Sequence, residues 1–360
     1  MEFKKISIFP INHENAALVR FAHMGKFEPF ALLSPELSVL DGCDISKLDG
    51  GSFADITLYA GYEDMIAKSD VVYFVNSKNI TADDESHYKK LIELSTKLKK
   101  EIMISDDVKR TLKLSLAEDK NNIEEMFEDF KVNPQLKQID APVVSIFSLG
   151  EDCGQAQTEL CARKYFLDKG YKVMQIGLQE YSSVIGWISF PDFLLDPKVD
   201  EFDKVMAFNR FVYKHYVKEN PDIILLSVPN PIMKYNDSIL NGLGILPFIV
   251  QSAVKSDIGI VNLYFANYAF EYLELLKNLC TYRFGVSAKY FGVSNTKVSK
   301  GVDDTASLDF LRLTSDFVKN NTPYDAGKDE FTLFSVFDEN DSFKAFEKIE
   351  NELIGNPAKI

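Results

Sequence analysis

The residues best suited to chemistry lie in one turn, 148–158 (SLGEDCGQAQT). This turn follows an apolar run and precedes a helical pattern, which is where a phosphate-binding loop lies in α/β proteins. Such a loop has the pattern GxxxxGK[ST]: glycine amides surround the phosphates, lysine neutralises them, and the hydroxyl binds Mg²⁺. With Gly154 as the second glycine, Leu149 replaces the first glycine, Gln155 the lysine and Ala156 the hydroxyl. The match to the pattern is therefore weak.

The changed residues argue against efficient ATP hydrolysis. A charged contact of the kind lysine makes is worth on the order of 1.5–3 kcal/mol, and here it is missing. Glu151 and Asp152 would also face a phosphate with two negative charges. A loop kept only for packing is the alternative interpretation. The candidates for a vestigial phosphate loop are Gly150, Asp152, Cys153, Gly154, Gln155 and Thr158, and we expect no cofactor, with ATP and Mg²⁺ disfavoured.

Cysteine and histidine offer little catalytic chemistry. Cys153 lies just before a predicted helix, where a thiol can ionise, but the histidine closest to it in the following sequence is His215. The four cysteines form no CxxC pair and have no histidine cluster beside them. We therefore predict ordinary thiols and no metal site, and the sequence identifies no catalytic residue.

Two polar and aromatic segments follow predicted strands and could form the rim of a pocket. One, QEYSSVIGWISFPDFLLDP, contains Trp187; the other begins at Asn230 and is rich in Asn, Gly and Pro. Packing beneath a long loop is the alternative for the aromatic residues. Aromatic side chains often anchor a partner, and an acidic rim suits a basic or neutral peptide. The partner-binding candidates are Glu151, Glu180, Trp187, Asn230 and Tyr235.

Apolar runs alternate with helical patterns along the chain, which predicts two α/β domains with parallel sheets. The first, residues 1–135, is expected to be Rossmann-like with a helical connector. The second, residues 140–360, is expected to be a doubly wound, degenerate P-loop-like domain with a C-terminal βα element. Its strands at 143–148, 172–177, 223–228 and 258–263 should be parallel and adjacent, in a sheet separate from that of residues 1–130. The loops at their carboxyl ends, 150–155, 175–187, 229–235 and 264–267, should form the functional surface.

The stretch SLGEDCGQAQTELCARKYFLDKGYKVMQIG resembles the P-loop domains of the dethiobiotin-synthetase-like class of NTPases, whose second strand also follows a GYKV-type turn. The segments NPDIILLSVPNPIM and LPFIVQSAVKSDIGIVNL resemble the later strands of that class. Over about residues 60–295, the arrangement resembles a family of peptide maturation system proteins, found beside radical-enzyme maturases of small ribosomal peptides.

That resemblance implies an accessory protein of ribosomal peptide natural-product maturation, which binds a precursor peptide or a maturation enzyme. The alternative is a nucleotide-dependent enzyme, an ATPase or a ligase, with a noncanonical phosphate loop. A third hypothesis is a protein that binds a small molecule.

The net charge of the chain argues against some classes of binding partner. The 360 residues carry 40 Lys and Arg against 54 Asp and Glu, a net charge of −14. Such an excess repels nucleic acid and anionic lipid, so we expect neither as a partner. No signal peptide or apolar run of membrane-spanning length is evident, which predicts a cytoplasmic protein. A homodimer is compatible with the sequence.

Overall fold

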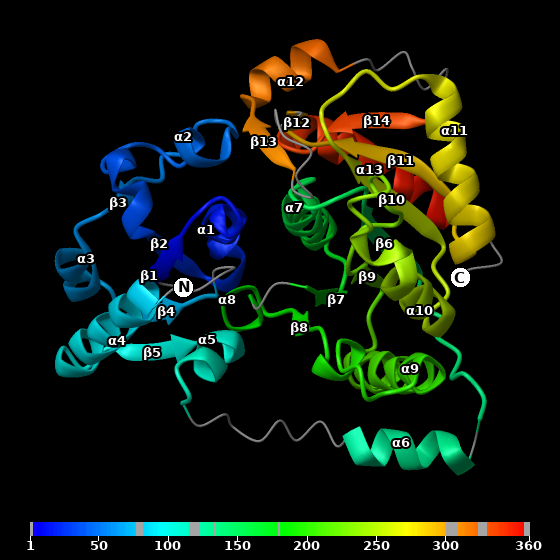
Figure 1. Ribbon diagram of the computed structural model, residues 1–360, viewed down its shortest axis with the longest axis horizontal. Helices are drawn as coiled ribbons and strands as arrows, with labels where there is room; N and C mark the ends of the chain where they lie inside the picture. The colour runs from blue at the N-terminus through cyan, green and yellow to red at the C-terminus, as the bar shows by residue number, and fades with distance from the viewer. Residues whose placement is uncertain are drawn as a thin grey trace. The chain divides into compact units, whose positions relative to one another are not determined.

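The protein is described here from a computed structural model, which covers residues 3–76, 82–114, 123–132, 134–178, 181–299, 308–322 and 330–355. It divides into two compact units. Unit 1 comprises Met1–Asp119 and Gln179–Ser189, and unit 2 comprises Lys120–Leu178 and Phe190–Ile360. Figure 1 shows the elements of both units.

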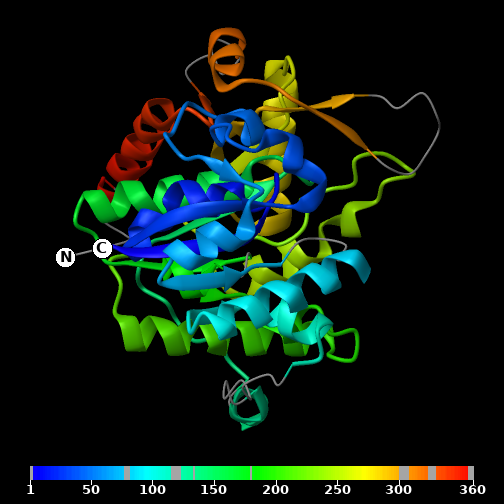
Figure 2. The ribbon, with the colours of Figure 1, turned by 90° about the vertical axis from the view of Figure 1, so that its left-hand side faces the viewer.

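Unit 1 contains a five-stranded parallel sheet of order β3-β2-β1-β4-β5, the order of a Rossmann-like domain. Helices lie above and below its strands in the view of Figure 2. Strand β4 is fully buried, as its continuous apolar sequence predicts. The strands are β1 (Lys4–Ile11), β2 (Phe27–Leu33), β3 (Leu58–Tyr59), β4 (Val71–Phe74) and β5 (Glu101–Ile104). The helices are α1 (Ala16–Phe21), η1 (Ala22–Gly25), η2 (Pro35–Leu40), α2 (Ser46–Asp49), α3 (Tyr62–Lys68), α4 (Ala82–Lys97), α5 (Asp106–Thr111) and α8 (Ser182–Ile185).

A seven-stranded sheet forms the core of unit 2, with the order β14-β11-β10-β6-β9-β7-β8. The pairs from β14 to β7 are all parallel. The four strands expected to be parallel neighbours are β10, β6, β9 and β7, in that order, so this prediction is confirmed. The bounds are β6 (Val143–Ser148), β7 (Val173–Gly177), β8 (Ile188–Ser189), β9 (Ile223–Ser227), β10 (Ile258–Leu263), β11 (Ala288–Val293) and β14 (Thr332–Ser335).

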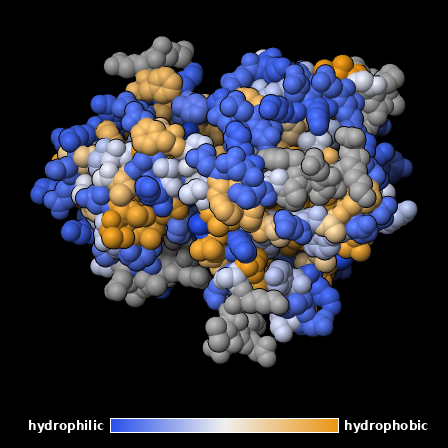
Figure 3. Space-filling model, turned by 90° about the horizontal axis from the view of Figure 1, so that it is seen from above, coloured by the Kyte–Doolittle hydropathy of each residue, from blue (hydrophilic) through white to orange (hydrophobic). Residues whose placement is uncertain are grey.

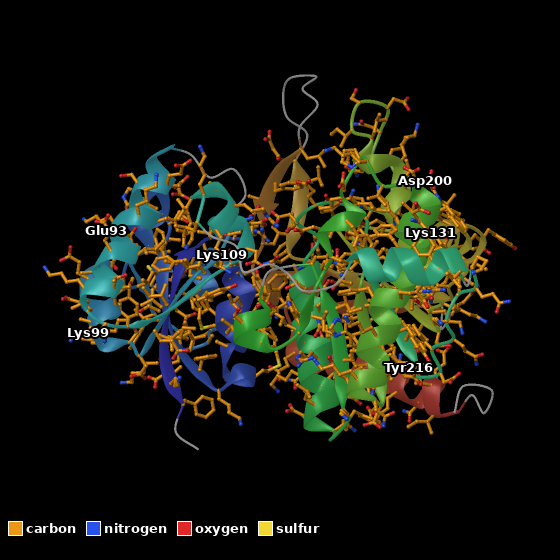
Figure 4. All side chains as sticks on the ribbon, turned by 90° about the horizontal axis from the view of Figure 1, so that it is seen from below. Glu93, Lys99, Lys109, Lys131, Asp200 and Tyr216 are labelled. Carbon is orange, nitrogen blue, oxygen red and sulfur yellow. The ribbon has the colours of Figure 1, made fainter. Side chains whose placement is uncertain are left out.

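Two helices of unit 2 show how the sequence sets their ends. The Asp200 carboxylate accepts the Phe202 N–H and caps α9; Asp200 is labelled in Figure 4. Gly170, two residues after the end of α7, has the left-handed φ of +89° that permits the turn into β7. The helices are α6 (Ile123–Val132), α7 (Gln155–Asp168), η3 (Asp192–Leu194), α9 (Glu201–Glu219), η4 (Asn241–Gly244), α10 (Ile245–Ala253), α11 (Phe270–Leu279), η5 (Cys280–Phe284), α12 (Ser315–Asn321) and α13 (Glu339–Ile354).

A small antiparallel hairpin follows β11 and was not predicted from the sequence. It consists of β12 (Thr296–Ser299) and β13 (Asp309–Arg312). The predicted helical connector is represented by α5, which belongs to unit 1, and α6, which belongs to unit 2. Hydrophilic residues dominate the face drawn in Figure 3, with apolar patches between them. In the described ranges, no helix is both long and apolar enough to span a bilayer.

Candidate functional site

The loop that joins β6 to α7 lies at the carboxyl end of a central strand, where open α/β sheets place ligands. Asp152 and Gly154 both have left-handed backbone angles, with φ of +61° and +73°. The chain therefore turns sharply and enters α7 at Gln155. This is the strand-turn-helix geometry of a phosphate loop, so its side chains decide what it can bind.

Gln155, in the lysine position, is bonded to the sheet. Its Nε2 donates to the Ile146 carbonyl and to the Val228 carbonyl, both at 3.1 Å. These two carbonyls belong to β6 and to the residue that follows β9. The amide thus joins the ends of two neighbouring strands and, unlike lysine, brings no positive charge into the loop.

Two further polar side chains of the loop, those of Asp152 and Thr158, are also paired within unit 2. Thr158 Oγ1 donates to Asn262 Oδ1 on β10 at 2.8 Å. Asp152 Oδ2 forms an ion pair of 2.7 Å with Nη2 of Arg312, which lies on β13. The Arg312 Nη1 also donates to Thr296 Oγ1 at 3.1 Å, across the hairpin. The hairpin therefore neutralises one of the two acids that would oppose an anion.

Tyr264, just after β10, covers the start of the loop. Its hydroxyl donates to the Glu151 carbonyl at 2.7 Å. A Cβ added to Gly150 would lie 2.1 Å from the Tyr264 hydroxyl oxygen, so only glycine fits beneath this ring. Cys153 is buried, and burial raises the pKa of its thiol. The thiol is consequently protonated at neutral pH, which argues against a reactive thiolate.

A buried acid lies behind the loop. Glu159 on α7 is 1% exposed, and burial raises the pKa of its carboxyl to about 8. Ser227 and Gln155 lie beside the carboxyl, but among the described residues neither Glu159 oxygen makes a hydrogen bond of good geometry, and the same is true of Ser227 Oγ and both side-chain polar atoms of Gln175. The register places Gln175 and Ser227 on the same face of the sheet. This cluster could not be predicted from the sequence, because a single Glu in a helix gives no sign of burial.

An aromatic pocket of about 480 Å³ opens at the same edge of the sheet. Tyr235 and Tyr264 meet edge to face with ring centroids 6.5 Å apart, and Tyr268 stacks on Tyr272 at 5.5 Å. Exposed Lys297 of β12 contributes to the lining, so the hairpin takes part here as well. The lining residues are Leu149, Tyr235, Tyr264, Phe265, Ala266, Asn267, Tyr268, Tyr272, Lys297 and Val298.

The predicted partner-binding residues lie in different places. Tyr235 lines the aromatic pocket. Asn230 is exposed and lies three residues after the end of β9. Glu180 lies outside the described residues. Trp187 is only 4% exposed and stacks on Tyr181 at 5.3 Å within unit 1. This burial removes the indole from the surface on which an anchor was expected, because the ring packs against its own chain.

In the described ranges, no group of three or more His, Cys, Asp or Glu side chains is arranged to hold a metal ion. Among the described residues, the candidate site has two parts. One is a turn with the shape of a phosphate loop, whose side chains are bonded to other residues of unit 2, and the other is the aromatic pocket beside it. Together with the parallel sheets, these features define a two-unit α/β protein whose second unit is P-loop-like.

Comparisons with known proteins support this fold. A crystal structure of a DUF1611 family protein from Anabaena variabilis matches 96% of this chain and 99% of its own length, with 12% identity and a TM-score of 0.56. At that identity, the likeness concerns the fold alone. Weaker matches are a pseudomurein peptide ligase from Methanothermus fervidus (13% identity, 85% of this chain and 53% of that chain, TM-score 0.26) and a GTPase from Pyrococcus abyssi (11%, 60% and 98%, 0.32). With TM-scores this low, these two structures say nothing further about the fold or the function of this chain. No family model and no curated protein sequence matches the chain.

Proposed function

We propose that this protein is an accessory protein of ribosomal peptide natural-product maturation, which binds a precursor peptide or a maturation enzyme and does not hydrolyse nucleotide. The maturation context rests on the sequence resemblance described above. The binding role rests on one observation: the phosphate-loop positions are occupied by bonds within unit 2, while the aromatic pocket beside them is open.

The pocket has the chemistry of a side-chain recognition site. Rigid tyrosine rings provide a large contact area at a small cost in conformational entropy, and their hydroxyls add polar contacts. Tyr235 is 42% exposed, so its ring is accessible to a partner. Exposed Lys297 can contribute a charged contact at the same pocket. These features favour a peptide segment with an aromatic or apolar residue over a nucleotide.

A pair of titrations tests the proposal. A labelled precursor peptide encoded beside the gene should bind the wild-type protein, and Tyr235→Ala should weaken binding roughly tenfold because a central aromatic contact is worth about 1–2 kcal/mol. Tyr216→Ala, on α9, is the matched control and should bind as the wild type does; Tyr216 is labelled in Figure 4.

The parallel titration uses MgATP. Binding weaker than about 1 mM, equivalent to roughly 4 kcal/mol, is expected. Micromolar MgATP binding that is lost in a Gln155 variant would instead support a nucleotide-dependent ATPase or ligase, and absence of peptide binding would overturn the accessory role.

A further inference from the structure

A second concave surface in unit 2 lies between α10 and α11, with a volume of about 830 Å³. Its walls are mainly apolar and strongly exposed: Ile245 and Phe248 are each 50% exposed, Leu275 is 52% exposed, and Tyr282 is 86% exposed. The lining residues are Met233, Ile245, Phe248, Leu275, Asn278, Leu279, Tyr282 and Arg283. We call this surface the α10–α11 groove.

The apolar residues form a stripe along α11. Leu275, Leu279 and Tyr282 recur at helical spacing, and Tyr272 of the aromatic pocket lies three residues before Leu275. The eleven residues from Tyr272 to Tyr282 are separated by ten steps along the helix, which span about 15 Å. This length matches a contact with about three turns of a partner helix, and Tyr272 extends the stripe to the aromatic pocket.

Charge identifies the kind of helix that fits. Glu271 lies one turn before Leu275, and Glu274 one turn before Asn278, so both flank the stripe on its solvent side. Both carboxylates are exposed and, among the described residues, neither has an ion-pair partner. The cations beside them are engaged: the Lys277 ammonium pairs with Glu330, and the Arg283 guanidinium donates to the Leu243 carbonyl.

These observations disfavour a second copy of the chain. A second copy would bring the same acidic residues and a net charge of −14 to the contact, so the two copies would repel each other. A basic partner, by contrast, would be attracted by Glu271, Glu274 and the net negative charge of the chain.

We propose that the α10–α11 groove binds a basic amphipathic helix of about three turns, with its apolar side against the stripe and its lysines or arginines beside Glu271 and Glu274. This inference deepens the proposed function by naming the kind of segment that the peptide or enzyme partner presents. Helix-in-groove binding of this type is recognised by apolar residues at i, i+3 and i+7 on the ligand.

The test is fluorescence anisotropy with a labelled 14-residue peptide that carries leucines at this spacing and lysines elsewhere. The basic peptide should bind with a micromolar Kd. A scrambled peptide of identical composition should bind at least about tenfold more weakly, and a version with glutamate for lysine should not saturate. Equal binding of the basic and scrambled peptides would overturn the proposal, because it would show attraction by net charge alone.

Substitutions in the groove test whether the basic peptide binds there. Leu275→Gln should weaken binding roughly fivefold, whereas Leu195→Gln, at a 70% exposed leucine outside the groove, should have no effect. Glu271→Gln with Glu274→Gln should weaken it about three- to tenfold and reduce its salt dependence. The control pair is Glu63→Gln with Glu93→Gln, two exposed acids of unit 1. Equal losses in the groove variants and their controls would overturn the proposal.

The outcome is separable from that of the proposed function. If the precursor peptide binds and Tyr235→Ala weakens it, but the groove variants bind both peptides normally, only the groove proposal fails. If the basic peptide binds through Leu275 while the precursor peptide does not bind at all, the groove proposal stands and the maturation role fails.

Discussion

Glu159 is a buried acid whose ionisation should affect the stability of the fold. Its carboxyl is buried under the loop, close to Ser227 and Gln155, and its pKa is raised to about 8 by burial. In the unfolded chain, the same carboxyl has a pKa near 4.3. The native state therefore holds a proton that the unfolded state releases as pH rises, so the stability of the native state falls between these two values.

Replacing Glu159 by Gln should remove this pH dependence. The free energy of unfolding of the wild type should fall by up to about 1.4 kcal/mol per pH unit from pH 5 to pH 8 through this group. Glu159→Gln should show a flatter profile over that interval in urea titrations, and Glu93→Gln, an exposed acid of unit 1 that is labelled in Figure 4, should follow the wild type. Parallel profiles for all three proteins would mean that Glu159 is ionised in the native state.

Gly150 provides a second test at the residue scale. Gly150→Ala should destabilise the protein by about 1–3 kcal/mol, because the new Cβ would lie 2.1 Å from the Tyr264 hydroxyl oxygen and one of the two must move. Gly61→Ala is the matched control, since a Cβ there meets no atom within 4 Å. Urea denaturation measures both. A Gly150→Ala variant as stable as Gly61→Ala would show that Tyr264 does not cover the loop.

At the scale of elements, the β12–β13 hairpin holds the loop through one ion pair. Arg312→Ala should release Asp152, so the amides of residues 150–154 should exchange hydrogen faster while protection of β6 and β10 stays unchanged. Arg110→Ala, which removes an exposed ion pair with Asp107 in unit 1, should leave exchange in the loop unaffected. Unchanged loop exchange in Arg312→Ala would show that the hairpin does not restrain the loop.

The contrast between this hairpin and the main strands explains what sequence could and could not predict. Strands such as β4 and β6 are buried on both faces, so their continuous apolar runs identify them directly. The hairpin strands, TKVS and DFLR, are short and partly exposed, and only tertiary contacts define them. Arg312 and Lys297 were therefore missed, although both contact the candidate site.

The candidate site, too, could be predicted from the sequence only in part. The loops after β6, β7, β9 and β10 were expected to form one surface. Leu149, Tyr235 and Tyr264, which follow or end three of these strands, line one pocket, whereas the described residues of 175–187 do not line it. A pattern of residue types cannot tell which aromatic ring remains exposed. Trp187 lies in a segment that belongs to unit 1, and it stacks on Tyr181, whose hydroxyl donates to the Glu14 carbonyl far away in the sequence.

At the scale of the whole molecule, the net charge of −14 governs how partners approach. An acidic surface attracts a basic peptide over about one Debye length, which is roughly 10 Å at 0.1 M salt and 3 Å at 1 M. Long-range attraction affects the association rate more than the dissociation rate, because the bound contacts are short and partly apolar.

The association rate of the basic 14-residue peptide should therefore fall by about tenfold as salt rises from 0.05 M to 0.5 M, with a smaller change in the dissociation rate. Stopped-flow fluorescence measures both rates, and an analogue with glutamine for lysine should associate slowly at every salt concentration. The variant Glu271→Gln with Glu274→Gln should associate more slowly than the wild type and lose part of the salt effect, because both acids flank the groove on its solvent side. The rest of the salt effect should remain, since the variant removes 2 of the 54 acidic residues. A salt-independent association rate for the basic peptide would show that the net charge of the protein does not steer its partners.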